Sequence, residues 1–260
     1  NKWISDYFLK IDNQTQLYKA IKYGVSNGGK RLRPYFIVEL SKILKIPKIS
    51  YKQIALSVEF IHCYSLIHDD LPSMDNDDFR RGKLTVHKKF NESTAILAGN
   101  CLYNMAIEII LDSKTSKNNG VRLELLKMIT HNSGPDGLML GQYYDLFYEN
   151  KNTGIKNILN TYSLKTSKLF ELSMSMPFVL QSKSNKEIKN AKLYGRNFGL
   201  IYQIADDFSD LDKEFNETGK IPGKDKEKGK NTIISKVGRK NALNLCHDLA
   251  KEATKDNKIF

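Results

Sequence analysis

Apolar residues recur along most of this chain with the spacing of an α-helix. Ile54, Val58 and Ile61 follow one another at i, i+4 and i+7, which is the pattern of a helix that buries one face. Similar spacing appears in three further stretches, which are residues 98–109, 195–205 and 233–250. Alternating strand patterns are nearly absent. Before residue 98, Asn91 and Ser93 are candidate N-caps.

Polar, glycine-containing or proline-containing segments interrupt these patterns. They fall at residues 26–29, 46–50, 71–89, 113–120, 131–137, 149–154, 181–187 and 216–231. We find no internal repeat and no linker between domains, and the only low-complexity tract is the lysine-rich segment 220–230. The sequence therefore predicts one all-α domain over residues 1–260.

Composition narrows the class of protein. Of the 260 residues, 40% are hydrophobic and 27% are charged, so wholesale disorder is excluded. The most apolar run, residues 95–111, contains two asparagines and a glutamate, so we expect no transmembrane helix. The first residues lack the apolar core of a signal peptide. Three widely spaced cysteines, Cys63, Cys101 and Cys246, form no disulfide pattern and suit a reducing cytoplasm.

The formal net charge is +12, from 41 Lys and Arg against 29 Asp and Glu. Such a charge attracts nucleic acid, anionic membranes or phosphorylated small molecules. A lysine-rich solvated surface is the commoner explanation, so the positions of the cations have to decide between these partners.

Two acidic clusters stand out. Residues 69–78 contain five aspartates, and Asp206-Asp207-Phe208-Ser209-Asp210 ends another apolar stretch. Asp206 and Asp210 are spaced i, i+4 and share a helical face. Pro72 takes Asp75 off regular helical geometry. Either cluster alone is more often a solvated helix end, but the pair favours oxygen-ligated Mg²⁺ or Mn²⁺.

Basic segments lie beside the acidic ones. Gly28–Pro34 reads GGKRLRP, and Phe79–Lys83 (FRRGK) directly follows the first acidic cluster. Lys165-Thr166 and the lysines at 220, 224 and 230 complete the set. Glycines let a backbone approach an anion and arginines grip phosphate oxygens, although the P-loop spacing is missing.

The mixture of charges favours a diphosphate ligand. A carboxylate 4 Å from a phosphate is repelled by about 4 kcal/mol at an effective dielectric constant near 20. Aspartates beside arginines therefore indicate Asp–Mg²⁺–phosphate bridges, with Arg and Lys on the remaining oxygens. Nucleic-acid binding explains the cations but not the aspartates next to them.

Three motifs carry a family resemblance: GGKRLRP at Gly28–Pro34, HDDLPSMDNDDFRRGK at His68–Lys83 and QIADDFSD at Gln203–Asp210. In order and spacing the chain resembles the trans-isoprenyl diphosphate synthases, most of all the bacterial farnesyl diphosphate synthases, from about Gly24 to Ala242. The resemblance implies a bundle of long helices around a central cavity (the isoprenoid synthase fold), a homodimer and three Mg²⁺ per active site.

The resemblance also implies roles for individual residues. Metal would be held by Asp69, Asp75 and Asp206, with Asp70, Asp207 and Asp210 as secondary ligands or anchors. The allylic diphosphate would contact Arg80, Lys165, Thr166, Gln203, Lys220 and Lys230. Isopentenyl diphosphate would contact Lys30, Arg33, His62 and Arg81. Those bearing most directly on catalysis would be Asp69, Asp75, Asp206, Lys165 and Arg80.

The reaction implied is condensation of isopentenyl diphosphate with dimethylallyl or geranyl diphosphate. In the family, the residue five positions before the first aspartate lies under the growing chain. Tyr64, next to Ser65, and the two-residue insertion between Asp69 and Asp75 resemble the pattern that stops at C15. A longer-chain synthase, such as one making geranylgeranyl diphosphate, stays open. The alternative from another class is a basic helical nucleic-acid-binding protein; we expect neither nucleic-acid nor integral membrane association.

Departures from the family pattern are few. Asn100 stands where Asp is usual, Ser167 replaces the glycine after Lys165-Thr166, and Ser209 replaces an apolar residue. None of these substitutions removes an expected ligand, but Ser167 puts the backbone geometry near Lys165 in doubt.

Overall fold

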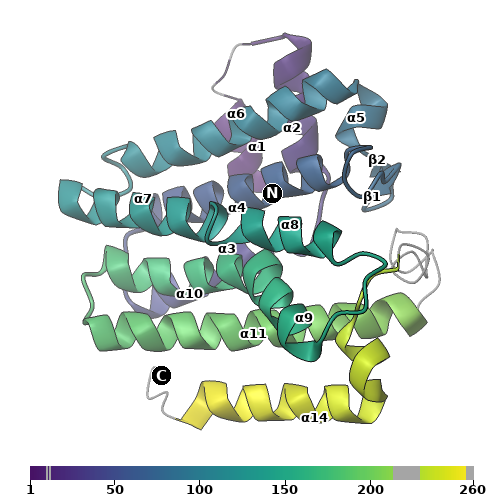
Figure 1. Ribbon diagram of the computed structural model, residues 1–260. Coiled ribbons are helices and arrows are strands. Elements are labelled where there is room, and N and C mark those ends of the chain that lie inside the picture. The colour runs from purple at the N-terminus through teal and green to yellow at the C-terminus, as the bar shows by residue number, and fades with distance from the viewer. Residues whose placement is uncertain (10, 12, 213–228, 256–260) are drawn as a thin grey trace. The chain divides into compact units, whose positions relative to one another are not determined.

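The computed structural model describes residues 1–9, 11, 13–212 and 229–255 (Figure 1). In this part of the chain the regular structure is helical apart from one short hairpin, so the predicted all-α class is confirmed. The chain divides into two compact units, Asn1–Leu126 and Lys127–Phe260, and each is described on its own. The single domain over residues 1–260 remains a prediction.

The first unit is built on two long helices that lie side by side, α4 and α6 (Figure 1). Ile54, Val58 and Ile61 of α4 are fully buried, and so are Ala98 and Leu102 of α6. The helical spacing in the sequence therefore does mark the core. The elements of this unit are α1 (Lys2–Phe8), α2 (Gln16–Ser26), α3 (Leu32–Ile43), α4 (Lys48–Asp69), β1 (Phe79–Arg80), β2 (Lys83–Leu84), α5 (Val86–Lys89) and α6 (Glu92–Leu111); α7 (Asn119–Ser133) begins in it.

The end of α4 is where the first acidic cluster leaves the helix. The helix stops at Asp69, three residues before Pro72, which has no N–H to donate and disfavours helical geometry in the residue before it. The chain then folds back, because the N–H of Asp75 donates to the carbonyl of Asp69 over 2.8 Å. The expectation that Pro72 takes Asp75 off the helix is confirmed.

Helix α6 begins at the predicted cap. The side chain of Asn91 accepts a hydrogen bond from the Thr94 N–H over 2.8 Å, which satisfies one of the unpaired donors of the first turn. By length and composition α6 is apolar enough to cross a membrane, so its polar interruptions do not by themselves exclude a span. Its packing against α4 and α2 is that of a core helix.

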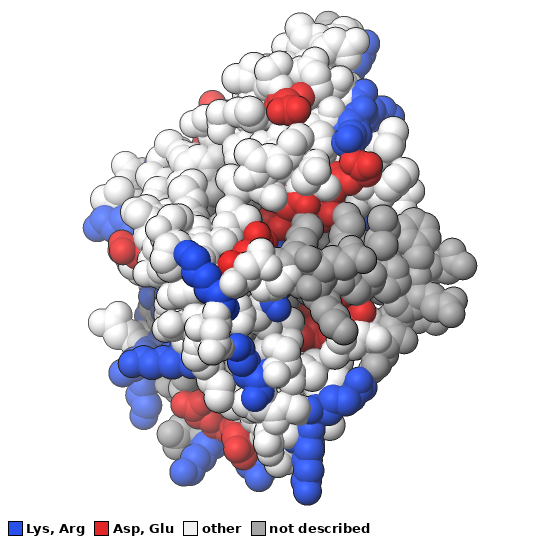
Figure 2. Space-filling view, turned by 45° about the vertical axis from the view of Figure 1, so that its right-hand side comes forward, with Lys and Arg blue, Asp and Glu red and all other residues white. Residues whose placement is uncertain are grey.

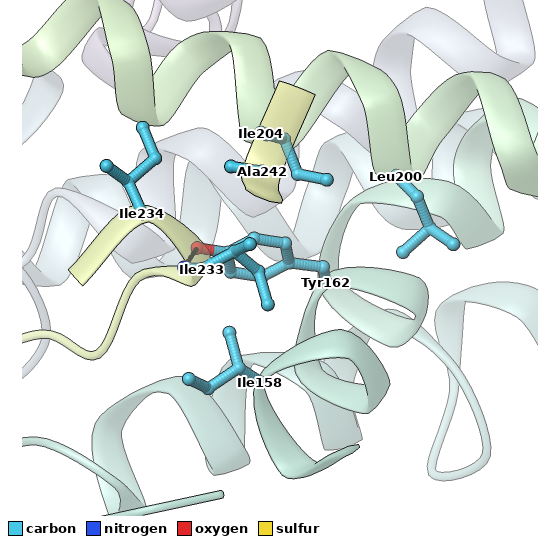
Figure 3. Close-up of a cluster of buried hydrophobic side chains, with 7 residues drawn as sticks. All are labelled: Ile158, Tyr162, Leu200, Ile204, Ile233, Ile234 and Ala242. Carbon is cyan, nitrogen blue, oxygen red and sulfur yellow. Dashed lines mark hydrogen bonds between the residues drawn. The ribbon is translucent and has the colours of Figure 1, made fainter. Parts of the chain in front are cut away.

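The second unit packs α10, α11 and α14 side by side (Figure 1). One of its buried clusters joins α9, α11 and α14 (Figure 3) and consists of Ile158, Tyr162, Leu200, Ile204, Ile233, Ile234 and Ala242. The elements, after the end of α7, are α8 (Leu138–Phe147), α9 (Ile155–Tyr162), the π-helical turn η1 (Ser163–Ser167), α10 (Lys168–Leu180), α11 (Asn185–Asp212) and α14 (Ile233–Lys255).

Three local features were not predicted. The segment 71–89 contains the hairpin β1–β2, in which Phe79 pairs with Leu84 and Arg80 with Lys83. Residues 163–167 form a π-helical turn inside an otherwise continuous helical stretch. Gly238 bends α14 with a φ of 76°, a left-handed value open to glycine.

Candidate active site

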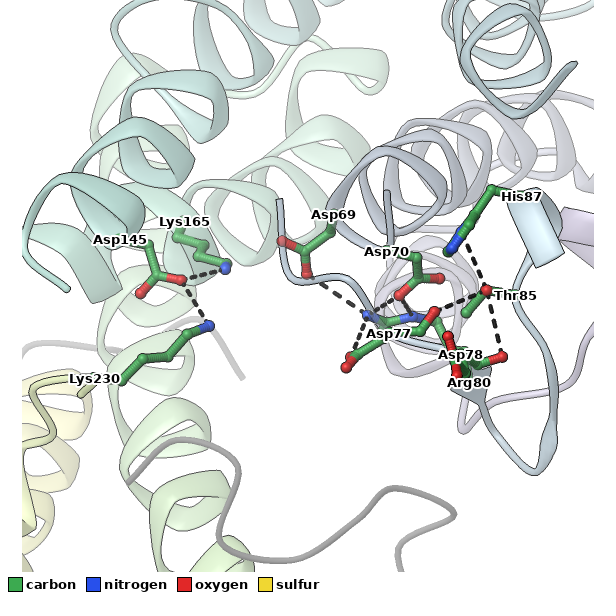
Figure 4. A network of polar contacts seen from close by, with 10 residues as sticks. All are labelled: Asp69, Asp70, Asp77, Asp78, Arg80, Thr85, His87, Asp145, Lys165 and Lys230. Carbon is green, nitrogen blue, oxygen red and sulfur yellow. Dashed lines mark hydrogen bonds and ion pairs between the residues drawn. The ribbon is translucent and has the colours of Figure 1, made fainter. Parts of the chain in front are cut away.

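In the first unit, three aspartates surround the guanidinium of Arg80 (Figure 4). Its Nε donates to Asp70 Oδ1 over 2.6 Å, and its Nη2 lies 2.5 Å from the same oxygen. Nη2 is also 3.6 Å from Asp69 Oδ2 and 4.0 Å from Asp77 Oδ2. Although burial opposes its charge, the Asp70 carboxylate keeps the pKa of Arg80 above its ordinary value. Arg80 is therefore a fixed cation.

The same geometry separates the roles of Asp69 and Asp70. The Asp70 side chain is buried, with only 3% of the residue exposed; it accepts a hydrogen bond from Arg80 Nε and forms an ion pair with Nη2. The Asp69 side chain retains 12% exposure at the edge of the network. Asp75 is buried in the turn that returns to Asp69. Asp70 thus acts on Arg80, whereas Asp69 is better placed to meet a ligand.

The glycine-rich loop before α3 is anchored by one of its own arginines. Arg31 pairs with the buried Glu59 and donates to the carbonyl of Val25 over 2.5 Å. Arg81, from the turn between β1 and β2, donates to the carbonyl of Gly28. Gly29 has a φ of 107°, a backbone conformation that other residues rarely adopt, and its missing side chain leaves room for the Arg81 guanidinium. Arg31 holds the loop, which leaves Lys30 exposed.

Arg33 and His62 meet on facing helices. Arg33 Nη1 lies 3.3 Å from His62 Nε2. Burial and the neighbouring Arg33 and Arg81 hold the pKa of His62 well below its usual range. His62 is consequently neutral at pH 7, and any contact it makes to a phosphate is a hydrogen bond rather than an ion pair.

Tyr64 and Ser65 lie one turn before the first aspartates. The Tyr64 ring is buried and meets the Tyr103 ring edge-on, with 5.3 Å between centroids, and the His68 ring at 5.6 Å. The Ser65 hydroxyl donates to the backbone of His62. Tyr64 is therefore a rigid aromatic backed by a second ring from α6.

In the second unit, Asp145 of α8 joins two lysines (Figure 4). Its Oδ2 accepts from Lys165 Nζ over 2.6 Å and from Lys230 Nζ over 3.2 Å. Lys165 stands on η1, whose backbone is so close to α8 that a Cβ on Gly141 would lie 2.2 Å from the Lys165 nitrogen. These contacts bring together two lysines that are 65 positions apart.

Thr166 and Gln203 are also brought together, and Asp207 with them. Thr166 Oγ1 donates to Gln203 Oε1 over 2.7 Å, and Gln203 Nε2 donates to Asp207 Oδ1 over 3.3 Å. Asp207 is buried, whereas Asp206 is exposed on the neighbouring position of α11 and Asp210 follows it one turn later. Lys220 lies outside the described residues.

The residues present fit Mg²⁺ in their chemistry. Among the described residues, no group of three or more His, Cys, Asp or Glu side chains could hold a metal ion by itself. Mg²⁺ does not require such a group, because it is commonly bound by one or two carboxylates together with substrate phosphates and water. Asp69 and Asp75 in one unit and Asp206 and Asp210 in the other supply carboxylate oxygens of that kind.

Two residues of the site had no role assigned from the sequence. Asp145 anchors the lysines, and its only signal was its place in a stretch shared with the family. Asp77, in the middle of the acidic run, contributes to the charge around Arg80. A carboxylate that serves a cation cannot be told from one that serves a metal by residue type alone.

The chain matches the polyprenyl synthetase family over residues 14–258. It is 36% identical to the farnesyl diphosphate synthase of Micrococcus luteus, over 92% of this chain and 81% of that protein. It is also 36% identical to geranylgeranyl pyrophosphate synthase 4 of Arabidopsis thaliana, over 95% and 67%.

A solved structure has the same fold. The geranyltransferase of Helicobacter pylori, determined in complex with magnesium and isoprenyl diphosphate, superposes with a TM-score of 0.85 at 32% identity, over 98% of this chain and 86% of that one. The predicted resemblance and the isoprenoid synthase fold are therefore confirmed, and the chain belongs to the polyprenyl synthetase family.

Proposed function

We propose that this protein is a prenyltransferase that condenses isopentenyl diphosphate with dimethylallyl and then geranyl diphosphate. The products are farnesyl diphosphate and pyrophosphate. The proposal is supported by membership of the polyprenyl synthetase family and by the farnesyl diphosphate synthases among its relatives. Mg²⁺ is the expected cofactor, and three ions per site is the number that the family resemblance implies.

One observation carries the proposal. Each unit contains a cation or cations that an aspartate holds in place, and each contains further aspartates. In the first unit Asp70 holds Arg80 beside Asp69; in the second Asp145 holds Lys165 and Lys230, while Asp206 is exposed on α11. Fixed cations together with carboxylates able to hold a divalent metal are what a diphosphate needs on its several oxygens.

The residues then have separate tasks in the reaction. Arg80, Lys165 and Lys230 bind the allylic diphosphate and stabilise its charge as the allylic C–O bond breaks, with both electrons leaving on pyrophosphate. Lys30, Arg33, Arg81 and neutral His62 hold isopentenyl diphosphate, whose double bond attacks the allyl cation. A proton is then lost to the released pyrophosphate. Asp69, Asp75, Asp206 and Asp210 would hold Mg²⁺, which when bound would supply positive charge for the leaving diphosphate.

We propose a C15 product because Tyr64 is a buried ring held by a second ring, Tyr103. A rigid aromatic below the growing chain would stop elongation by volume. The equal identity to an A. thaliana geranylgeranyl pyrophosphate synthase supports the longer-chain alternative.

The experiment that tests the reaction is incubation with isopentenyl and dimethylallyl diphosphates, with and without Mg²⁺, followed by chromatography of the prenyl products. We expect a Mg²⁺-dependent C15 product. Longer products would overturn the proposed length but keep the reaction. Folded protein that yields no prenyl product in Mg²⁺ would overturn the proposed function.

The role of Tyr64 has its own test. Tyr64→Ala should extend the products beyond C15, because it removes the buried ring. Tyr51→Ala is the matched control: Tyr51 is also buried and also on α4, but it packs against Trp3. An unchanged product ladder in Tyr64→Ala, or an equal extension in Tyr51→Ala, would reject this role.

Several finer properties belong to the same proposal. We propose a cytoplasmic enzyme, which is supported by three cysteines that are all free, and a homodimer, for which exposed Ile96 and Leu97 of α6 offer apolar surface. Nucleic acid is not a proposed partner. On the face seen in Figure 2, Lys and Arg lie in separate groups with Asp and Glu between them rather than in one basic surface.

A further inference from the structure

Tyr162 occupies a junction in the second unit that the reaction proposed above does not use. It is the last residue of α9 and directly precedes η1, which carries Lys165 and Thr166. Its ring is buried in the cluster shared by α9, α11 and α14, next to Ile158 and Ile233 (Figure 3). The ring alone would be ordinary core packing.

The hydroxyl of Tyr162 is what distinguishes it. It donates to Asp207 Oδ2 over 2.5 Å and accepts from the backbone N–H of Ile233 over 3.4 Å. Burial and the Asp207 carboxylate both raise the pKa of Tyr162 above its ordinary value, so the hydroxyl keeps its proton as a donor. One buried oxygen thus joins α11 to the first residue of α14.

The other oxygen of Asp207 extends the connection. It accepts from Gln203, which in turn accepts from Thr166. A continuous path of hydrogen bonds therefore runs from Thr166 through Gln203, Asp207 and Tyr162 to the Ile233 N–H. Both carboxylate oxygens of Asp207 receive protein donors, in contrast to the exposed Asp206 beside it.

The path ends at Ile233, which lies close in sequence to Lys230. Lys230 lies three residues before Ile233 and reaches Asp145, and between them Asn231 donates to the carbonyls of Tyr148 and Lys151. Hydrogen bonds therefore hold the segment 230–233 at several points. The contact at the start of α14 is the one made by Tyr162. Displacing Ile233 would move Lys230.

We propose that Tyr162 is a positioning residue, which through Asp207 and Ile233 sets the places of Thr166, Gln203 and Lys230 for a diphosphate. The inference rests on the proposed function for the identity of the diphosphate as an allylic substrate. It assigns Asp207 to the protein framework rather than to metal binding.

The test compares Tyr162→Phe with Ile158→Val. The first keeps the ring and removes the hydroxyl, while the second trims one methylene from the same cluster and leaves every hydrogen bond in place. Inorganic pyrophosphate with Mg²⁺ is the probe, titrated into each protein by calorimetry, and thermal unfolding gives the stability of each variant. Asp207→Asn is a second variant for the same path.

We expect the Kd for pyrophosphate to rise about tenfold in Tyr162→Phe and in Asp207→Asn, which corresponds to loss of about one hydrogen bond to a charged group. Ile158→Val should bind as the unaltered protein does. In turnover assays the KM for the allylic substrate should rise more than the KM for isopentenyl diphosphate, whose proposed contacts lie in the first unit. A purely structural role would not separate the two KM values.

Wild-type affinity in Tyr162→Phe, an equal loss in Ile158→Val, or no binding of pyrophosphate by the unaltered protein would each overturn the inference. Because pyrophosphate with Mg²⁺ is not a substrate, the binding result is independent of whether the protein makes a prenyl product. Binding that behaves as expected without any prenyl product would overturn the proposed function and leave the role of Tyr162 supported.

Discussion

At the scale of single residues, the two aspartates in each of the pairs Asp69–Asp70 and Asp206–Asp207 lie in different surroundings. Asp70 and Asp207 are 3% and 4% exposed and accept hydrogen bonds from the protein. Their neighbours Asp69 and Asp206 are more open to solvent. Successive residues on a helix point about 100° apart, so one carboxylate of a pair can face the interior while the other faces a ligand.

This division predicts different outcomes for identical substitutions. Asp69→Asn and Asp206→Asn should each lower kcat by about a hundredfold or more. Each substitution removes a carboxylate proposed to hold Mg²⁺, and with it the positive charge that stabilises the leaving diphosphate. Asp78→Asn is the control, since Asp78 belongs to the same acidic run but pairs with Lys88 at the surface. Steady-state rates at saturating Mg²⁺ measure the effect, and wild-type rates in either of the first two variants would reject the metal assignment.

His62 predicts a pH dependence of stability. Its pKa is lowered in the folded protein by burial and by nearby arginines, so below about pH 6.5 the unfolded chain binds more protons than the folded one. The free energy of unfolding should therefore fall as pH drops below about 6.5. It should fall less in His62→Gln, as measured by urea unfolding at pH 7 and pH 5.

The control for this prediction is His131→Gln, which removes a histidine whose side chain is 60% exposed. That variant should lose stability with acid as the unaltered protein does. If His62→Gln and His131→Gln follow the same curve, His62 is not the group responsible.

At the scale of elements, the π-helical turn is the feature that sets Lys165 apart. Such turns insert an extra residue into a helix and so re-aim the side chains next to it; they are frequent at functional sites. Here η1 lies against α8 at Gly141, where a side chain would meet backbone atoms of Leu164 and Lys165. The close approach of the η1 and α8 backbones at Gly141 thus also fixes the position of Lys165.

Gly141→Ala should therefore destabilise the protein by about 1–3 kcal/mol, as overpacking does, and raise the KM for the allylic substrate. Gly154→Ala is the matched control. Gly154 lies in the same unit, has a φ of −80° and would meet nothing within 4 Å. The Tm from thermal unfolding and the KM for the allylic substrate are measured on both variants. An unchanged Tm and KM in Gly141→Ala would contradict the prediction, because η1 could then move without effect on stability or binding.

At the scale of the whole molecule, charge is the property that acts over distance. A net charge of +12 draws diphosphates toward the protein. We therefore expect kcat/KM for either substrate to fall severalfold between about 50 and 300 mM KCl, where the screening length shortens from over 10 Å to a few ångströms. Sucrose at equal osmolality does not screen charge and serves as the control, and a salt-independent kcat/KM would contradict the expectation.

The sequence by itself determined the helices and the chemical inventory of this protein. The spacing of Ile54, Val58 and Ile61, the Asn91 cap and the break at Pro72 are all confirmed. Each depends on residues within a few positions, since helix periodicity, capping and proline geometry are local properties of the backbone. The two acidic clusters were visible for the same reason.

Only the tertiary structure decided what each charged residue does. Arg31 is tied to Glu59, 28 positions away, while its neighbour Arg33 meets His62. Tyr162 and Asp207 are 45 positions apart, and Asp145 and Lys230 are 85 apart. Partners at such distances are brought together by helix packing, which depends on side chains along whole elements. No local pattern could therefore separate a carboxylate that anchors a cation or a tyrosine from one that stays open to solvent.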